Sequence, residues 1–212
     1  RGSGLKSVKE SWLAKLGHWR EALELYERRL VGNPHDVAAI LGCMKCLDAL
    51  GNWERVVELY FRTRLTLRSE STDPKVRKKA AALGANAAWS LGRWDDMEEL
   101  VSVMEPEEPA VEGPFFRAVI AVHKNRYEDA ALHIDRARQL LDNTFTALVA
   151  ESYKRAYTSM VSVQLLAELE EVIDYTRGHL DSLRAGESPK RSRALMEKWD
   201  RRLRGCRLEV NA

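Results

Sequence analysis

Basic side chains in the later part of the chain are the residues best suited to hold a charged ligand. Lysine and arginine bind phosphate through charge-assisted hydrogen bonds, so several of them between packed helices would form an anion site. Two alternatives stay open: a solvated basic helix face, or Arg155 paired within the chain with Glu151 or Glu170. The candidate residues are Lys154, Arg155, Arg177, Lys190, Arg191, Arg193, Lys198, Arg201, Arg202 and Arg204.

Cysteine and histidine offer a second kind of chemistry, but their spacing is poor for it. Cys43 and Cys46 form a CxxC pair, a spacing used in zinc and redox sites. A zinc site would need a second pair of ligands, which is missing. The third cysteine, Cys206, is remote in the sequence. We expect His123 and His133 to lie at the surface or in helix contacts. The sequence therefore predicts two reduced, packed thiols and no metal site.

A repeated motif defines the elements that must position these residues. Gly17, Gly51 and Gly92 are each followed two residues later by tryptophan, and a fourth copy has Asn125 and Tyr127 instead. Glycine adopts the left-handed backbone conformation that ends a helix, and the aromatic residue begins the next one. A repeat of about 34 residues with these features is typical of tetratricopeptide helical hairpins.

The predicted fold is all-α, an α-solenoid of stacked antiparallel helical hairpins of the tetratricopeptide type. Residues 1–9 are interpreted as an N-terminal extension or cloning scar, 10–207 as the repeats and 208–212 as a tail. The predicted hairpins span about 5–32, 36–68, 74–104, 114–142 and 144–186, followed by an unpaired helix over 188–205.

Individual residues add expectations that the fold can test. Gly42 lies inside a predicted helix, where glycine is unfavourable, so we expect a close helix crossing there. The tryptophans at 19, 53 and 94 are predicted to pack within their hairpins. In the fifth hairpin a break near Gln164 is expected, with Met160 and Val163 facing inward.

Composition excludes several classes of protein. The chain has 212 residues, 45% of them hydrophobic, and a formal net charge of +2, which gives no general attraction to nucleic acid or membranes. There is no apolar run of about 18 residues that would predict a membrane span. There is no Gly-rich phosphate loop after a strand and no catalytic-loop motif, so no catalytic residues are expected.

Several longer blocks resemble the FAT domain of the TOR kinases, the target-of-rapamycin branch of the phosphatidylinositol-3-kinase-related kinases. The likeness covers roughly residues 10 to 207. The most specific block runs from Glu151-Ser152-Tyr153 through Arg155-Ala156-Tyr157 and Met160-Val161 to Glu170-Glu171-Val172-Ile173-x-Tyr175. Other matching blocks are Leu41-Gly42-x-Met44-x-Cys46-Leu47, Ala87-Ala88-Trp89-x-Leu91-Gly92-x-Trp94, Phe116-Arg117-Ala118-Val119 and Trp199-x-x-Arg202-Leu203.

This resemblance implies a non-catalytic scaffold of a TOR serine/threonine protein kinase. Such domains curl round the kinase domain, so the implied partners are the kinase domain and HEAT repeats of the same polypeptide, complex subunits and regulators, without nucleic acid or membrane insertion. The implied location is cytoplasmic, with recruitment to lysosomal or vacuolar membranes within the complex. The resemblance also matches Arg155 to a site for inositol hexakisphosphate. The alternative function is a ligand-binding module, either for inositol polyphosphate or for short peptides.

Overall fold

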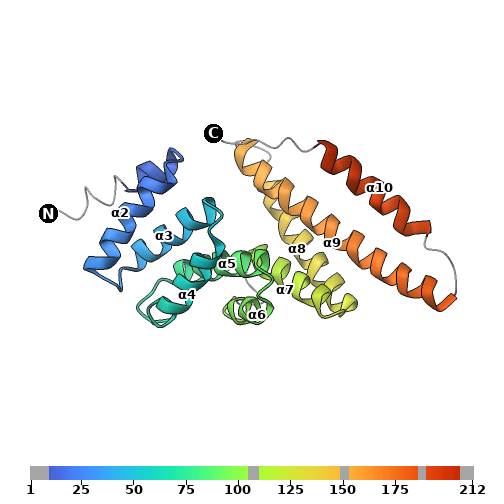
Figure 1. Ribbon diagram of the computed structural model, residues 1–212, viewed down its shortest axis with the longest axis horizontal. Helices are drawn as coiled ribbons and strands as arrows, with labels where there is room; N and C mark the ends of the chain where they lie inside the picture. Colours follow the sequence, from blue (N-terminus) through green and yellow to red (C-terminus); the bar gives the residue numbers. More distant parts are fainter. Residues whose placement is uncertain (1–9, 105–109, 149–152, 186–189, 206–212) are drawn as a thin grey trace. The chain divides into compact units, whose positions relative to one another are not determined.

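The computed structural model describes residues 10–104, 110–148, 153–185 and 190–205, with side chains omitted at 144–148, 153–156, 158, 179–185, 190–192 and 205. The described residues form helices joined by turns and contain no β-strand, which confirms the all-α prediction (Figure 1). The predicted terminal segments 1–9 and 208–212 lie outside this range. Residues 10–15 are helical. The labelled helices are α2 Trp19–Gly32, α3 Val37–Ala49, α4 Trp53–Leu67, α5 Pro74–Ser90, α6 Trp94–Ser102, α7 Glu112–His123, α8 Tyr127–Leu148, α9 Tyr153–Ala185 and α10 Lys190–Gly205.

The chain divides into two compact units, an N-terminal unit (Arg1–Phe116) and a C-terminal unit (Arg117–Ala212). In the N-terminal unit α2 contacts α3, α3 contacts α4, α4 contacts α5 and α5 contacts α6, and α3 also contacts α5. In this unit the first helix of one hairpin therefore meets the first helix of the following one. Nearest-neighbour contact between repeats is the way in which a tetratricopeptide array is stabilised.

The four predicted turn residues all adopt the left-handed conformation. The φ angles are +84° at Gly17, +69° at Gly51, +67° at Gly92 and +58° at Asn125. At each turn two backbone N–H groups donate back into the preceding helix in the Schellman pattern, as from Asn52 to the Leu47 carbonyl at 2.9 Å. Asparagine is the commonest substitute for glycine in this conformation, so the fourth turn keeps the same geometry without glycine.

The residue three positions after each aromatic is the one that the core buries. Ala22, Val56, Met97 and Ala130 are all completely buried. Trp53, by contrast, keeps 36% of its surface exposed, and Trp19 and Trp94 are only partly buried. The prediction that the tryptophans pack within their hairpins is therefore correct only in part.

Glycine permits two close helix crossings in the N-terminal unit. A Cβ atom at Gly42 in α3 would lie 2.5 Å from Cε1 of Tyr26 in α2, which confirms the predicted crossing. Gly84 in α5 meets α6 in the same way, and its Cβ would lie 2.8 Å from Cδ2 of Leu100. Both distances are shorter than a carbon–carbon contact, so only glycine fits without displacing the neighbour.

A buried ion pair ties the first described residues to the start of α3. Glu10 is only 2% exposed, and its carboxylate accepts a hydrogen bond from Arg29 at 2.6 Å. The same guanidinium donates to Asp36 at 2.6 Å, and Asp36 caps α3 by accepting from the backbone N–H of Ala39 at 3.0 Å. Arg29 therefore connects three segments of the first hairpins. Its positive charge compensates the loss of hydration when the carboxylates of Glu10 and Asp36 are buried.

In the C-terminal unit the predicted helix boundaries are wrong. The fourth hairpin was expected to end near Asp142-Asn143, but α8 continues to Leu148. The fifth hairpin, 144–186, does not exist, because α9 is one helix of 33 residues with no break near Gln164. The Gln164 side chain donates to Glu168 one turn later at 2.8 Å, as in an uninterrupted helix.

The pairing of the last helices also differs from the prediction. The partner of α9 is α8, and α10, which was expected to be unpaired, packs on α9 (Figure 1). The helix end expected at Asp142-Asn143 is absent because aspartate and asparagine cost only a few tenths of a kcal/mol inside a helix. Contacts with neighbouring helices readily override this cost.

Candidate functional site

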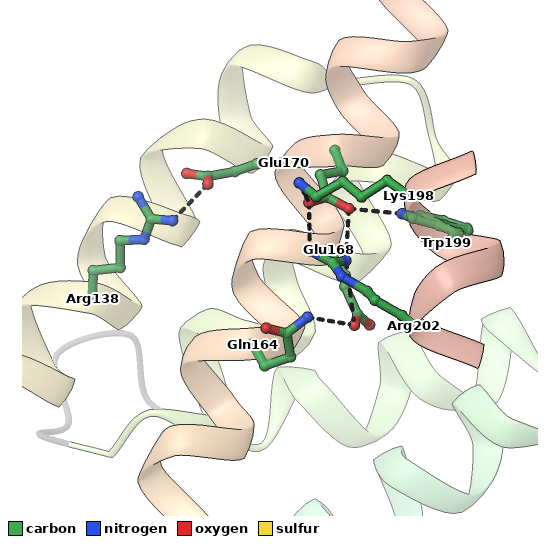
Figure 2. A network of polar contacts seen from close by, with 8 residues as sticks. Arg138, Gln164, Glu168, Glu170, Lys198, Trp199 and Arg202 are labelled. Atoms are coloured by element: carbon green, nitrogen blue, oxygen red, sulfur yellow. Dashed lines mark hydrogen bonds and ion pairs between the residues drawn. The ribbon is translucent and has the colours of Figure 1, made fainter. Parts of the chain in front are cut away.

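In the C-terminal unit, Lys198, Trp199 and Arg202 of α10 point toward α9 (Figure 2), where all three contact the carboxylate of Glu171. Arg202 on α10 makes two parallel hydrogen bonds to the carboxylate, each of 2.9 Å, and the Trp199 indole N–H donates to it at 2.7 Å. Lys198 also donates to the same carboxylate. We call Glu171, Lys198, Trp199 and Arg202 the Glu171 cluster. Its donors lie one turn apart on α10, so a single carboxylate fixes the register of the two helices.

The electrostatics of the cluster favour the ionised carboxylate. Burial of Glu171, whose side chain is 15% exposed, raises the pKa of this group, but the hydrogen bonds from Lys198, Arg202 and Trp199 outweigh burial and lower the pKa to about 2. A bidentate arginine–carboxylate pair is among the strongest polar contacts in proteins. Lys198 and Arg202 therefore bind within the chain, and the structure does not assign them to an anion site.

A second ion pair bears on the role proposed for Arg155. Glu170, one of the two internal partners considered for Arg155, accepts a hydrogen bond from Arg138 of α8 at 2.5 Å (Figure 2). Arg155 itself lies near the start of α9, and its side chain is outside the described residues, as are Lys154 and Glu151. Glu170, one alternative partner of Arg155, is therefore paired with Arg138. The assignment of Arg155 to an anion site stays a prediction.

The other predicted basic residues are spread over different surroundings. Arg177 lies 5.6 Å from the ring centroid of Tyr127, a cation–π contact that joins α9 to the start of α8. Arg204 pairs with Asp200, and Arg201 donates to the Glu197 carbonyl on its own helix. Lys190 and Arg191 have no described side chains. The predicted basic cluster is thus not one site among the described side chains.

The cysteines agree with the prediction of packed thiols. Cys43 and Cys46 are both buried in α3 and are not disulfide-bonded. Burial raises the pKa of Cys43 to about 12 and that of Cys46 to about 11. Since the thiolate is the reactive form, both groups are chemically inert at neutral pH. Cys206, the third cysteine, lies outside the described residues.

The described residues contain neither a cluster of metal ligands nor a membrane-spanning helix. No group of three or more His, Cys, Asp and Glu side chains there is placed to hold a metal ion. The His133 imidazole is partly buried, and burial followed by the charge of Arg117 lowers the pKa of the ring. Among the described helices, none is both long and apolar enough to cross a membrane.

Sequence reasoning missed the exposed apolar side chains of the last helices. Met160 is 56% exposed and Val163 is 40% exposed, so the expectation that both face inward is wrong. Met196 and Leu203 on α10 are each 70% exposed. Their spacing of seven residues places them on one face of the helix, and this spacing is the signal that could have identified an unpaired apolar face.

The fold and these contacts describe a helical-repeat protein, and sequence comparison gives its family. The FAT domain profile matches residues 81–212, more than half of the chain, and a tetratricopeptide repeat profile matches residues 8–38. The chain therefore belongs to the FAT domain family.

Several relatives are TOR kinases. The chain is 43% identical over 199 residues to the serine/threonine-protein kinase mTor of Drosophila melanogaster, covering 94% of this chain and 7% of the fly protein. It is 38% identical over 221 residues to TOR of Oryza sativa subsp. japonica, covering 96% of this chain and 9% of that protein. TOR2 of Saccharomyces cerevisiae is 35% identical over 204 residues, covering 96% of this chain and 8% of the yeast protein. The chain thus spans less than a tenth of the length of these relatives.

Proposed function

We propose that this chain is a non-catalytic scaffold segment of a TOR serine/threonine kinase. It braces the kinase domain and presents surfaces to HEAT repeats of the same polypeptide, to complex subunits and to regulators in growth and nutrient signalling. The similarity to TOR kinases over nearly the whole chain supports this proposal. Its proposed location is the cytoplasm, with recruitment to lysosomal or vacuolar membranes through the complex. Phosphate transfer itself belongs to a catalytic domain elsewhere in such a kinase.

The observation that carries the proposal is the apolar surface of α9 and α10. Tyr157 and Met160 on α9 and Met196 and Leu203 on α10 are all more than half exposed. Met196 and Leu203 share one face of α10 because they are seven residues apart, and an apolar face exposed to solvent commonly marks a protein contact. Because the Glu171 cluster holds α10 to α9 by polar contacts, the apolar face of α10 remains available for another protein surface.

The experiment changes this face in an intact TOR kinase that contains the chain. The double variant M196D/L203D places two carboxylates on the exposed face of α10. Both side chains are largely solvated, so we expect the isolated chain to keep its melting temperature. In the whole kinase we expect weaker assembly of the complex and at least about tenfold lower kinase activity, because buried charges at an interface cost several kcal/mol.

A matched control adds a carboxylate to the same helix away from this face. Ala194 is exposed and lies about 180° around α10 from Leu203 at 100° per residue. We expect Ala194→Asp to leave assembly and activity unchanged. Equal activity of the double variant and the control would contradict the scaffold proposal.

A second candidate function is binding of inositol hexakisphosphate, with Arg155 as a contact. The unbroken helix α9 favours it, because it separates Arg155 from Glu170, one of its two alternative partners, by about 22 Å along the helix axis. In the whole protein we expect Arg155→Ala to weaken inositol hexakisphosphate binding by roughly tenfold, as for one lost charge-assisted contact. Calorimetry that finds unchanged affinity would remove Arg155 from the site.

A further inference from the structure

Helix α9 carries a stripe of residues spaced three or four positions apart, apolar at one end and acidic at the other. Its members, which we call the α9 stripe, are Tyr157, Met160, Gln164, Glu168 and Glu171. At 100° per residue they lie within about 80° of one another around the helix. The buried side chains of Leu166 and Ile173 lie on the opposite side of α9. The stripe is therefore a second contact face of the helix.

Contacts with α10 lie at the acidic end of the stripe. The Trp199 indole donates to Glu171 at 2.7 Å, and the Arg202 guanidinium lies 3.9 Å from the Glu168 carboxylate. The side chain of Glu171 is 15% exposed there, whereas Met160, toward the apolar end, is 56% exposed. Exposure of the stripe therefore rises toward the start of α9, away from these contacts with α10.

The same two contacts fix an antiparallel register between the helices. From the first contact to the second, α10 advances by three residues while α9 goes back by three, because both helices have the same rise per residue. Four further residues along this register bring Cys206 opposite Gln164. Another four bring Val210 opposite Met160. Residues 206–212 follow α10 in the sequence and lie outside the described residues.

The segment after α10 has the side chains and the length that this register requires. At 100° per residue, Cys206 and Val210 lie within about 50° of the side of α10 that contacts Glu171. Seven helical residues span about 10 Å, which equals the length of the stripe from Gln164 to Tyr157. The segment therefore reaches the apolar end of the stripe with a valine on the correct side.

We propose that residues 206–212 continue α10 as a helix and cover the apolar end of the α9 stripe, with Val210 packed on Met160. This surface continues the existing contact between α10 and α9, and packing there removes apolar side chains from water. Gly205 is compatible with such a helix, as Gly42 is with α3. The inference goes beyond the proposed scaffold function, whose test changes the other edge of α10, so either proposal can fail without the other.

Oxidation by hydrogen peroxide measures this cover in the 212-residue chain. Met160 and Met196 are 56% and 70% exposed, so without the cover their thioethers should be oxidised at similar rates. With the cover, we expect Met160 to be oxidised at least about fivefold more slowly than Met196. Mass spectrometry of proteolytic peptides gives both rates in one sample. Equal rates would overturn the inference.

Two aspartate variants assign the protection to one side of the segment. Val210→Asp places a charge against Met160 and should bring its oxidation rate to within about twofold of that of Met196. Leu208→Asp is the matched control, because position 208 lies about 150° around the helix from the α9 side, and it should leave the protection intact. Circular dichroism confirms that both variants are folded. Loss of protection in both variants, or in neither, would overturn the inference.

The oxidation rates are also compared at two chain concentrations. A cover formed within one chain gives the same protection of Met160 at both concentrations. Protection that increases with concentration and survives Val210→Asp would show that a second copy of the chain covers the stripe, which would contradict the inference.

A chemical cross-link tests the register independently. Gln164→Cys places a thiol opposite Cys206, and a bismaleimide that spans about 8 Å, the spacing of packed helices, should join the two. Val163→Cys is the control, because Val163 is 40% exposed but lies about 100° around α9, so its link to Cys206 should form at least about tenfold more slowly. Cys43 and Cys46 are buried and react slowly. Equal rates for the two variants would overturn the register.

Discussion

The N-terminal and C-terminal units use different contacts to join their helices. In the N-terminal unit, α2 to α6 contain between 9 and 17 residues each and meet through buried apolar side chains and two glycine crossings. In the C-terminal unit, α9 alone has 33 residues, and α10 is fixed to it by the Glu171 cluster. The N-terminal contacts depend mainly on shape, although ion pairs such as Arg29–Asp36 add to them, and those of α10 depend largely on charge.

This difference matters for what each unit leaves exposed. A contact built on shape removes apolar side chains from water, as with the completely buried Ile40, Met44 and Tyr60. A contact built on one carboxylate uses few apolar side chains, so Met196 and Leu203 remain in solvent. The last helix of the C-terminal unit therefore keeps apolar side chains exposed, and we expect the two units to respond differently to mutation and to pH.

Replacement of a turn glycine should have the largest effect. Gly51 has φ +69°, and a Cβ atom added there would meet no other atom within 4 Å, so the cost of a side chain is conformational rather than a clash. Gly51→Val should lower the free energy of unfolding by about 2 kcal/mol, because a β-branched residue is strained in the left-handed region. Chemical denaturation followed by circular dichroism measures this change.

The control for that variant comes from the protein itself. Asn125 has φ +58° at the equivalent turn. Gly51→Asn should therefore lower the free energy of unfolding by less than about 1 kcal/mol. If valine and asparagine were equally tolerated, the left-handed turn would not be what limits stability here.

Replacing the glycine at either helix crossing with alanine should have a smaller effect on stability. The effect should differ between Gly42 and Gly84. At Gly42 the added methyl group would meet the ring of Tyr26 at 2.5 to 2.7 Å, whereas at Gly84 it would meet the end of the Leu100 side chain. Gly42→Ala should cost about 1 kcal/mol net, since overpacking exceeds the gain in helix propensity. Gly84→Ala should be nearly neutral, because Leu100 has rotatable bonds that let its end move.

The same denaturation experiment compares the two alanine variants. The important quantity is the difference between their free energies of unfolding. A larger loss for Gly84→Ala than for Gly42→Ala would show that the rigidity of the facing side chain does not decide the cost.

Removal of the Glu171 charge should have little effect on the N-terminal unit and a local effect on α10. Glu171→Gln keeps the shape but loses the charge-assisted hydrogen bonds from Lys198 and Arg202, worth about 1 kcal/mol for partly exposed donors. Hydrogen exchange of α10 should become roughly fivefold faster, which is the same energy expressed as a rate. Exchange in α3 of the N-terminal unit should be unchanged.

This contact should also weaken in acid. The pKa of Glu171 falls from its ordinary value of 4.5 to about 2 in the folded chain. A lowered carboxyl pKa contributes stability above the unfolded value and loses it as the pH falls toward the folded value. The protection factor of α10, which is the ratio of the intrinsic to the observed exchange rate, should therefore fall between pH 4.5 and 2, and Glu171→Gln should remove this component. An unchanged pH profile in the variant would assign the acid sensitivity to other groups.

The sequence by itself determined the features that depend on neighbouring residues. The four turn residues, the helix starts at Trp53 and Tyr127 and the crossing at Gly42 were all predictable, because backbone conformation and helical periodicity are local properties. The two packed thiols, Cys43 and Cys46, were predictable for the same reason, because local periodicity predicts the helix that contains them.

Only the tertiary structure decided the arrangement of the last three helices. Asp142-Asn143 looks like a helix end and Gln164 like a break, yet α8 and α9 continue through them. Local preferences there amount to a few tenths of a kcal/mol, which is less than the free energy of packing one helix on another. The pairing of Glu171 with residues of α10 joins positions about 30 residues apart, and a contact of that kind has no signature in local sequence.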